Sequence, residues 1–142
     1  MSDTESVEPS GLAGKCLCET VSFVIDGPAR PVVNCHCSRC RRHTGHFMAA
    51  TAASVSDVEI SGDTLTWYEA AEGTEYGFCS RCGSTLFWRT ARRPGLVSIA
   101  AGTLTPPTGL ETVAAIYTDY ASDYHSFDHS IPAHGDDFPG SG

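Results

Sequence analysis

The chain has 142 residues, of which 41% are hydrophobic, and a formal net charge of −8. This length and composition are typical of one globular domain with its own core. The acidic balance argues against general affinity for nucleic acid or anionic lipid. No run of 18 apolar residues is present, so no membrane partner is expected. The oligomeric state is not indicated by the sequence.

Both ends of the chain are polar. The N-terminus, MSDTESVEPSG, lacks the basic and apolar segments of a secretory signal. We expect residues 1–12 to be a disordered lead-in, residues 13–132 to form a single β domain and residues 133–142 to be a flexible tail. Seven cysteines, an odd number, in a chain without an expected export signal favour a cytoplasmic protein with reduced thiols over a disulfide framework.

Short β-prone runs follow one another along the chain, separated by turns that contain Gly, Asp or Pro. The segment TVSFVID alternates, with Val21, Phe23 and Ile25 on one face. Further strands are predicted at 47–55, 58–62, 65–70, 75–79, 84–88, 96–100 and 113–120. A helix of about two turns is predicted at 38–44, with Ser38 as its N-cap. The sequence therefore predicts a mainly β domain.

Four of the cysteines form two pairs. Cys16 and Cys18 are expected within a strand, which would put both sulfurs on one face. Cys79 and Cys82 lie in FCSRCGS, a zinc-knuckle pattern in which Gly83 can adopt the positive φ that closes the turn. Together the two pairs would make a closed tetrahedral zinc site. Such a site is structural, because it has no open ligand position and contributes folding energy.

The stretch NCHCSRCRRHTG contains the other three cysteines, Cys35, Cys37 and Cys40. Three protein ligands and one exchangeable position are typical of a catalytic zinc. Two alternatives remain open: His43 could complete a closed site, or the thiols could be buried without metal. His36 would point away from its neighbouring cysteines if this stretch is extended.

An open zinc–thiolate centre can hold an incoming thiol as its thiolate and can polarise a carbonyl group. Addition of a thiol to an aldehyde, and the reverse, require these two effects. Arg41 and Arg42 could hold a substrate carboxylate, or could be solvated surface residues. His43, with His36 and His46, is near enough in sequence for proton transfer, or could be an ordinary hydrogen-bonded histidine. Arg41, Arg42 and His43 are the candidate substrate-binding residues.

The motifs GKCLCETVSFVIDG, NCHCSRCRRHTG, FCSRCGSTLFW and AGTL, in this order, resemble the glutathione-dependent formaldehyde-activating enzyme family, which also includes centromere protein V-like proteins. The resemblance covers about residues 14–132 and includes all seven cysteines. It implies the mainly β fold that the family shares with methionine-R-sulfoxide reductases and a Rab exchange-factor protein.

The same resemblance implies two zinc ions per chain. The structural zinc would be held by Cys16, Cys18, Cys79 and Cys82. The catalytic zinc would be held by Cys35, Cys37 and Cys40, where glutathione is expected to bind. The implied reaction is that of a carbon–sulfur lyase, which condenses formaldehyde with glutathione to S-(hydroxymethyl)glutathione.

The sequence departs from the family pattern at four places. Glu19 stands where Gly is usual, Ala115 where His is usual and Tyr124 where Trp is usual, and DHSIP at 128–132 replaces a DGLP-like stretch. None of these is an expected zinc ligand, but the C-terminal changes would alter a substrate pocket. Two other functions fit the sequence: a non-enzymatic zinc module that binds a protein partner, and a redox enzyme that uses free thiols.

Overall fold

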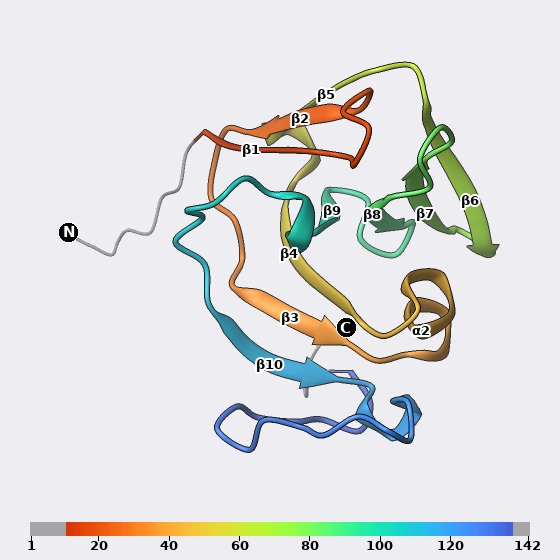
Figure 1. The fold of residues 1–142 in the computed structure, drawn as a ribbon, viewed down its shortest axis with the longest axis vertical. Helices are drawn as coiled ribbons and strands as arrows, with labels where there is room; N and C mark the ends of the chain where they lie inside the picture. The colour runs from red at the N-terminus through yellow and green to blue at the C-terminus, as the bar shows by residue number, and fades with distance from the viewer. Residues whose placement is uncertain (1–10, 138–142) are drawn as a thin grey trace.

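The computed structural model describes residues 11–137, which form two β-sheets (Figure 1). The smaller sheet has three antiparallel strands in the order β1-β2-β5. The larger has seven, in the order β10-β3-β4-β9-β8-β7-β6, and all neighbours are antiparallel except β10 and β3. The strands are β1 (Leu12–Lys15), β2 (Ser22–Ile25), β3 (Val32–Cys35), β4 (Met48–Ser54), β5 (Val58–Ser61), β6 (Leu65–Ala71), β7 (Thr74–Cys79), β8 (Thr85–Thr90), β9 (Leu96–Ala100) and β10 (Thr112–Ile116).

The prediction of a mainly β domain is confirmed. The alternation around β2 is confirmed too, because Val21, Phe23 and Ile25 are buried. The strand predicted at 113–120 ends early, since Tyr117 adopts a left-handed conformation with φ 55° and a 3-10 turn follows at Thr118–Tyr120. Strand β3 was not predicted, and the strand expected to contain Cys16 and Cys18 is β1, which ends at Lys15. The fold shared with methionine-R-sulfoxide reductases and a Rab exchange factor remains a prediction.

The main core lies where the two sheets face each other. Phe23 of β2 meets Phe87 of β8 edge to face, with ring centroids 5.1 Å apart, among other buried side chains of both sheets. A second, smaller buried cluster contains Cys40, Met48 and Tyr76 and lies beside the helix. Burial of these apolar groups is the principal stabilising contribution.

The helix α2 (Ser38–Thr44) connects β3 to β4 and has the predicted bounds. The prediction of Ser38 as its N-cap is wrong. Cys37 is the N-cap, and its sulfur accepts a hydrogen bond from the backbone N–H of Cys40 at 3.3 Å. A cysteine sulfur thus takes the place that a serine or threonine hydroxyl occupies in most caps. Gly45 ends the helix with φ 90°.

The predicted lead-in and tail lie partly outside the described residues, which exclude 1–10 and 138–142. Leu12, the last residue of the predicted lead-in, begins β1. Residues 133–137 follow β10: the N–H of His134 donates to the carbonyl of Ala115, and the N–H of Tyr117 to that of Asp136, both at 2.9 Å. The limits of the domain remain a prediction. No helix within residues 11–137 is long and apolar enough to cross a membrane.

Candidate metal centres

The four-cysteine group consists of Cys16, Cys18, Cys79 and Cys82, whose sulfurs all lie within 4.8 Å of one another. Two sulfur–sulfur distances, Cys16 to Cys18 and Cys18 to Cys79, are 3.8 Å. Thiolates arranged tetrahedrally about 2.3 Å from a zinc ion lie about 3.8 Å apart. The residues present therefore fit a closed zinc site without rearrangement of the chain.

Two turns bring these sulfurs together. Cys16 follows β1 and Cys18 lies in the next turn, so the prediction that both lie in a strand is wrong. The N–H of Glu19 donates to the carbonyl of Cys16 at 3.0 Å, and Glu19 has φ 70°, a conformation that glycine adopts more easily. On the opposite side Gly83 has the predicted positive φ, at 81°. The geometry of a turn, and not the alternation of a strand, therefore directs the sulfurs of Cys16 and Cys18 toward those of the other pair.

Hydroxyl groups surround the four-cysteine group. The Thr20 hydroxyl lies 3.1 Å from the Cys18 sulfur and 3.4 Å from that of Cys79, and the Ser84 hydroxyl 3.1 Å from that of Cys82. Hydrogen bonds donated to sulfur favour the thiolate. The hydroxyls of Thr20 and Thr64 lower the pKa of Cys79 to about 5, and the Ser84 hydroxyl lowers that of Cys82 to about 7. These partners were not predicted, although Thr20 and Ser84 share a position two residues after a cysteine.

The three-cysteine group consists of Cys35, Cys37 and Cys40, whose sulfurs also lie within 4.8 Å of one another. Cys35 ends β3, Cys37 caps α2 and Cys40 lies in its first turn. Hydrogen bonds from the other two thiols lower the pKa of Cys37 to about 2, and the hydrogen bond to Cys37 raises that of Cys35 to about 12. Three adjacent sulfurs thus cannot all be thiolates without a cation, and this soft donor set suits zinc.

His43 lies outside the three-cysteine group. Its ring stacks on Tyr76 with centroids 4.5 Å apart, and its Nδ1 is 3.0 Å from the Thr85 hydroxyl. Among residues 11–137 the groups with metal-ligand geometry are the two cysteine groups alone. In the described part of the chain, therefore, the three-cysteine group is one donor short of a tetrahedral set.

Tyr76 is a residue of this site that the sequence did not reveal. Its side chain is buried, and its hydroxyl lies 3.0 Å from the Cys40 sulfur. Burial and the nearby sulfur raise its pKa, so the hydroxyl stays protonated and can donate to a thiolate. Tyr76 precedes Cys79 by three residues on β7, so this strand contacts both cysteine groups.

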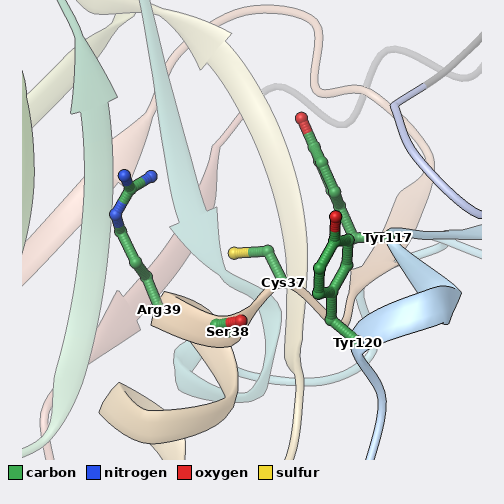
Figure 2. Close-up of a pocket in the computed structure, with 5 residues that line it drawn as sticks. All are labelled: Cys37, Ser38, Arg39, Tyr117 and Tyr120. Carbon is green, nitrogen blue, oxygen red and sulfur yellow. The ribbon is translucent and has the colours of Figure 1, made fainter.

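A cavity of about 320 Å³ opens beside Cys37 (Figure 2). Its lining residues are Cys37, Ser38, Arg39, Tyr117 and Tyr120. Figure 2 shows Arg39 on one side of the Cys37 sulfur and the two tyrosine rings on the other. None of the candidate substrate-binding residues, Arg41, Arg42 and His43, lines this cavity. The Arg41 Nε donates to the carbonyl of Tyr120 at 3.2 Å, and Arg42 is exposed.

His36, between two cysteines, packs into a cluster of rings. It is 1% exposed, and its centroid lies 4.8 Å from that of Phe47, 4.9 Å from that of His125 and 5.1 Å from that of Phe127. Neither ring nitrogen has a hydrogen-bond partner within residues 11–137. Burial lowers the pKa of His36 to about 4. This packing attaches the C-terminal segment to the beginning of α2.

The departures from the family pattern have different surroundings. Ala115 is buried in β10, opposite Asn34 of β3. Tyr124 is 71% exposed and stacks on His46 with centroids 5.7 Å apart. The change at Tyr124 therefore alters the surface near α2, whereas the change at Ala115 lies inside the sheet.

Comparisons with known proteins identify a family and a protein of similar fold. The model of a family described as glutathione-dependent formaldehyde-activating enzyme matches residues 11–120, a range that contains all seven cysteines. A crystal structure of a Rhodobacter sphaeroides protein is similar in fold, with a TM-score of 0.57 and 21% identity, covering 85% of this chain and 98% of that one. A comparison with curated proteins gives no match. Since the family model spans more than half of the sequence, this chain belongs to the glutathione-dependent formaldehyde-activating enzyme family.

Proposed function

We propose that the protein is a zinc-dependent enzyme of the carbon–sulfur lyase type, which forms or breaks the adduct of a thiol and an aldehyde. The family description indicates glutathione and formaldehyde as the pair. The observation that carries the proposal is the incomplete three-cysteine group, which adjoins a cavity at Cys37. A zinc ion bound there would have one free ligand position for a substrate sulfur and would lower the pKa of that thiol.

The reaction joins the substrate sulfur to the aldehyde carbon, and the thiol proton ends on the aldehyde oxygen. The reverse reaction breaks the same carbon–sulfur bond. The chain's own groups hold the three sulfurs in place: the Tyr76 hydroxyl donates to Cys40, and the backbone N–H of Cys40 donates to Cys37. Stacking of His43 on Tyr76 restricts the phenol ring. Fixed ligands of this kind are needed for a defined open position.

The four-cysteine group has a separate role in the proposal. A zinc ion held by Cys16, Cys18, Cys79 and Cys82 would have no free position and would connect the turn after β1 to the β7–β8 hairpin. Metal binding in such a group adds to the stability of the fold. We therefore propose two zinc ions per chain within a single domain of residues 13–132.

The direct test is consumption of free formaldehyde in the presence of glutathione, with the uncatalysed rate subtracted. The zinc-loaded wild type should accelerate this loss, and Cys37→Ser should not. Acceleration by Cys37→Ser equal to that of the wild type would contradict the proposal. A wild type that holds two zinc ions but accelerates no thiol–aldehyde reaction would instead favour a non-enzymatic zinc module, and zinc absent from the three-cysteine group would favour free-thiol redox chemistry.

A further inference from the structure

Arg39 lines the cavity beside Cys37 and has no competing partner within residues 11–137, whereas Arg41 and Arg42 do not line that cavity. Arg39 is exposed in the first turn of α2 and has no hydrogen-bond or ion-pair partner among residues 11–137. Arg41, by contrast, is committed to the carbonyl of Tyr120, and Arg30 donates to the carbonyl of Ala50 at 3.0 Å. Within the cavity beside Cys37, the Arg39 guanidinium is the group with a positive charge and free donors.

The opposite wall of this cavity is built by a strained turn. Tyr117 has φ 55° and ψ 36°, a conformation that is unfavourable for a residue with a β-carbon. Three hydrogen bonds hold the turn: from the N–H of Tyr117 to Asp136, from the N–H of Tyr120 to Tyr117, and from Arg41 to Tyr120. Strain that is maintained in this way tends to occur at ligand sites. The turn places two phenol rings in the cavity lining, on the side of Cys37 opposite to Arg39 (Figure 2).

The charged residues that line this cavity favour binding of an anion more than those of the neighbouring hollow do. The adjoining hollow, which also contacts Tyr120, contains Asp119 and Asp123 together with Arg41, so its charges oppose an added carboxylate. The cavity beside Cys37 has Arg39 and no acidic residue in its lining. Its volume of about 320 Å³ lies at the lower end of the range for small-molecule sites.

We propose that Arg39 binds a carboxylate of the substrate thiol while the rings of Tyr117 and Tyr120 contact its backbone, so that the protein selects thiols that bear a carboxylate over neutral thiols. This inference rests on the proposed function in one respect, which is that the substrate sulfur lies beside Cys37. A guanidinium suits this role because its planar array of N–H donors matches the geometry of a carboxylate.

The test measures binding by calorimetry to the zinc-loaded protein. The probes are glutathione, S-methylglutathione, which keeps both carboxylates but cannot form a thiolate, and 2-mercaptoethanol, a neutral thiol. In Arg39→Gln, binding of the first two should weaken about tenfold, the effect of losing one charge-assisted hydrogen bond. Binding of 2-mercaptoethanol should be unchanged. The matched control is Arg81→Gln, an exposed arginine in the turn between Cys79 and Cys82, for which all three probes should bind as in the wild type.

Zinc content of two per chain in each variant confirms that the site is intact. Equal binding of S-methylglutathione to the wild type and Arg39→Gln, or no binding to either, would overturn the inference and leave the proposed function standing. An equal loss for 2-mercaptoethanol and glutathione would also overturn it. Binding of S-methylglutathione that depends on Arg39, in a protein that accelerates no thiol–aldehyde reaction, would support the inference and contradict the proposed function.

Discussion

The two cysteine groups use the same ligand atom but differ in number of donors and in surroundings. The four-cysteine group receives hydroxyl hydrogen bonds from Thr20, Thr64 and Ser84 and joins the main core through Cys16 and Cys79. The three-cysteine group belongs to the smaller cluster, has the Tyr76 hydroxyl as its hydroxyl partner and adjoins a cavity. Completeness and enclosure suit a structural centre, and a missing donor beside a cavity suits a reactive one.

The largest effect should come from breaking the four-cysteine group. Cys82→Ser removes one of its ligands, and because zinc in such groups contributes on the order of 10 kcal/mol, the variant should not fold stably. Circular dichroism and thermal unfolding would measure this. The control is Ser84→Ala, which removes the hydroxyl that contacts the same sulfur and accepts from the N–H of Leu17 but leaves all four ligands in place, and it should fold with two zinc ions. A folded Cys82→Ser protein with full zinc content would show that this group is not structural.

Acid should act on the region next to the three-cysteine group through His36. The unfolded state binds a proton near pH 6.5 and the folded state only near pH 4, so acidification between these values favours unfolding. This group alone should lower the free energy of unfolding by about 2 kcal/mol between pH 6.5 and pH 5, and should have no effect above pH 7.

The matched variant is His36→Phe, which keeps a ring in the cluster with Phe47 and Phe127. Denaturant unfolding of both zinc-loaded proteins across this pH range gives the slope of the free energy of unfolding against pH for each. Any effect of acid on the cysteine groups is common to both proteins and cancels in the difference. Parallel pH curves for the wild type and His36→Phe would contradict the buried neutral state assigned to His36.

Thr20→Val changes the surroundings of the four-cysteine group without removing a ligand. It removes the hydroxyl that lies within hydrogen-bond distance of Cys18 and Cys79, and should lower the free energy of unfolding by about 2 kcal/mol. Turnover per folded, zinc-loaded molecule should not change, because Thr20 does not contact the three-cysteine group. A fall in turnover at unchanged stability would reverse the roles of the two groups.

Tyr76→Phe is the corresponding change on the three-cysteine side. Loss of the hydrogen bond to Cys40 should reduce kcat/KM about tenfold, because the position and charge of one ligand sulfur change. The free energy of unfolding should fall by only about 1 kcal/mol, since the ring is retained. Steady-state kinetics and denaturant unfolding together separate this pattern from that of Thr20→Val. Unchanged kinetics would show that the hydroxyl has no part in the reaction.

The spacing of the cysteines in the sequence was sufficient to predict a group of four and a group of three, because the number of residues between ligands can be read from the sequence. The neighbours of the sulfurs were not predictable. The Tyr76 hydroxyl meets Cys40 of α2 from β7, a strand that is distant in sequence. Tyr117 lines the cavity beside Cys37 from a turn in which its own backbone is left-handed. The sequence suggested Arg41 and Arg42 as carboxylate-binding residues and not Arg39, and only the fold shows that Arg39 lines the cavity.

The local errors have a similar origin. Cys37 replaces Ser38 as the cap because its sulfur points back over the helix, and Cys16 and Cys18 meet through a turn closed by Glu19. Local propensity favours serine caps and alternating strands, but tertiary contacts of the clustered sulfurs determine the backbone at these positions.

The number of zinc ions bound by Cys37→Ser is the direct measure of whether the two cysteine groups bind metal separately. We expect a protein that folds like the wild type, holds one zinc ion per chain where the wild type holds two, and consumes no formaldehyde with glutathione. Elemental analysis of the purified protein beside its unfolding curve gives both quantities. Two zinc ions per chain in Cys37→Ser would contradict the assignment of separate structural and catalytic groups. Unfolding of the variant together with the loss of zinc would contradict it as well.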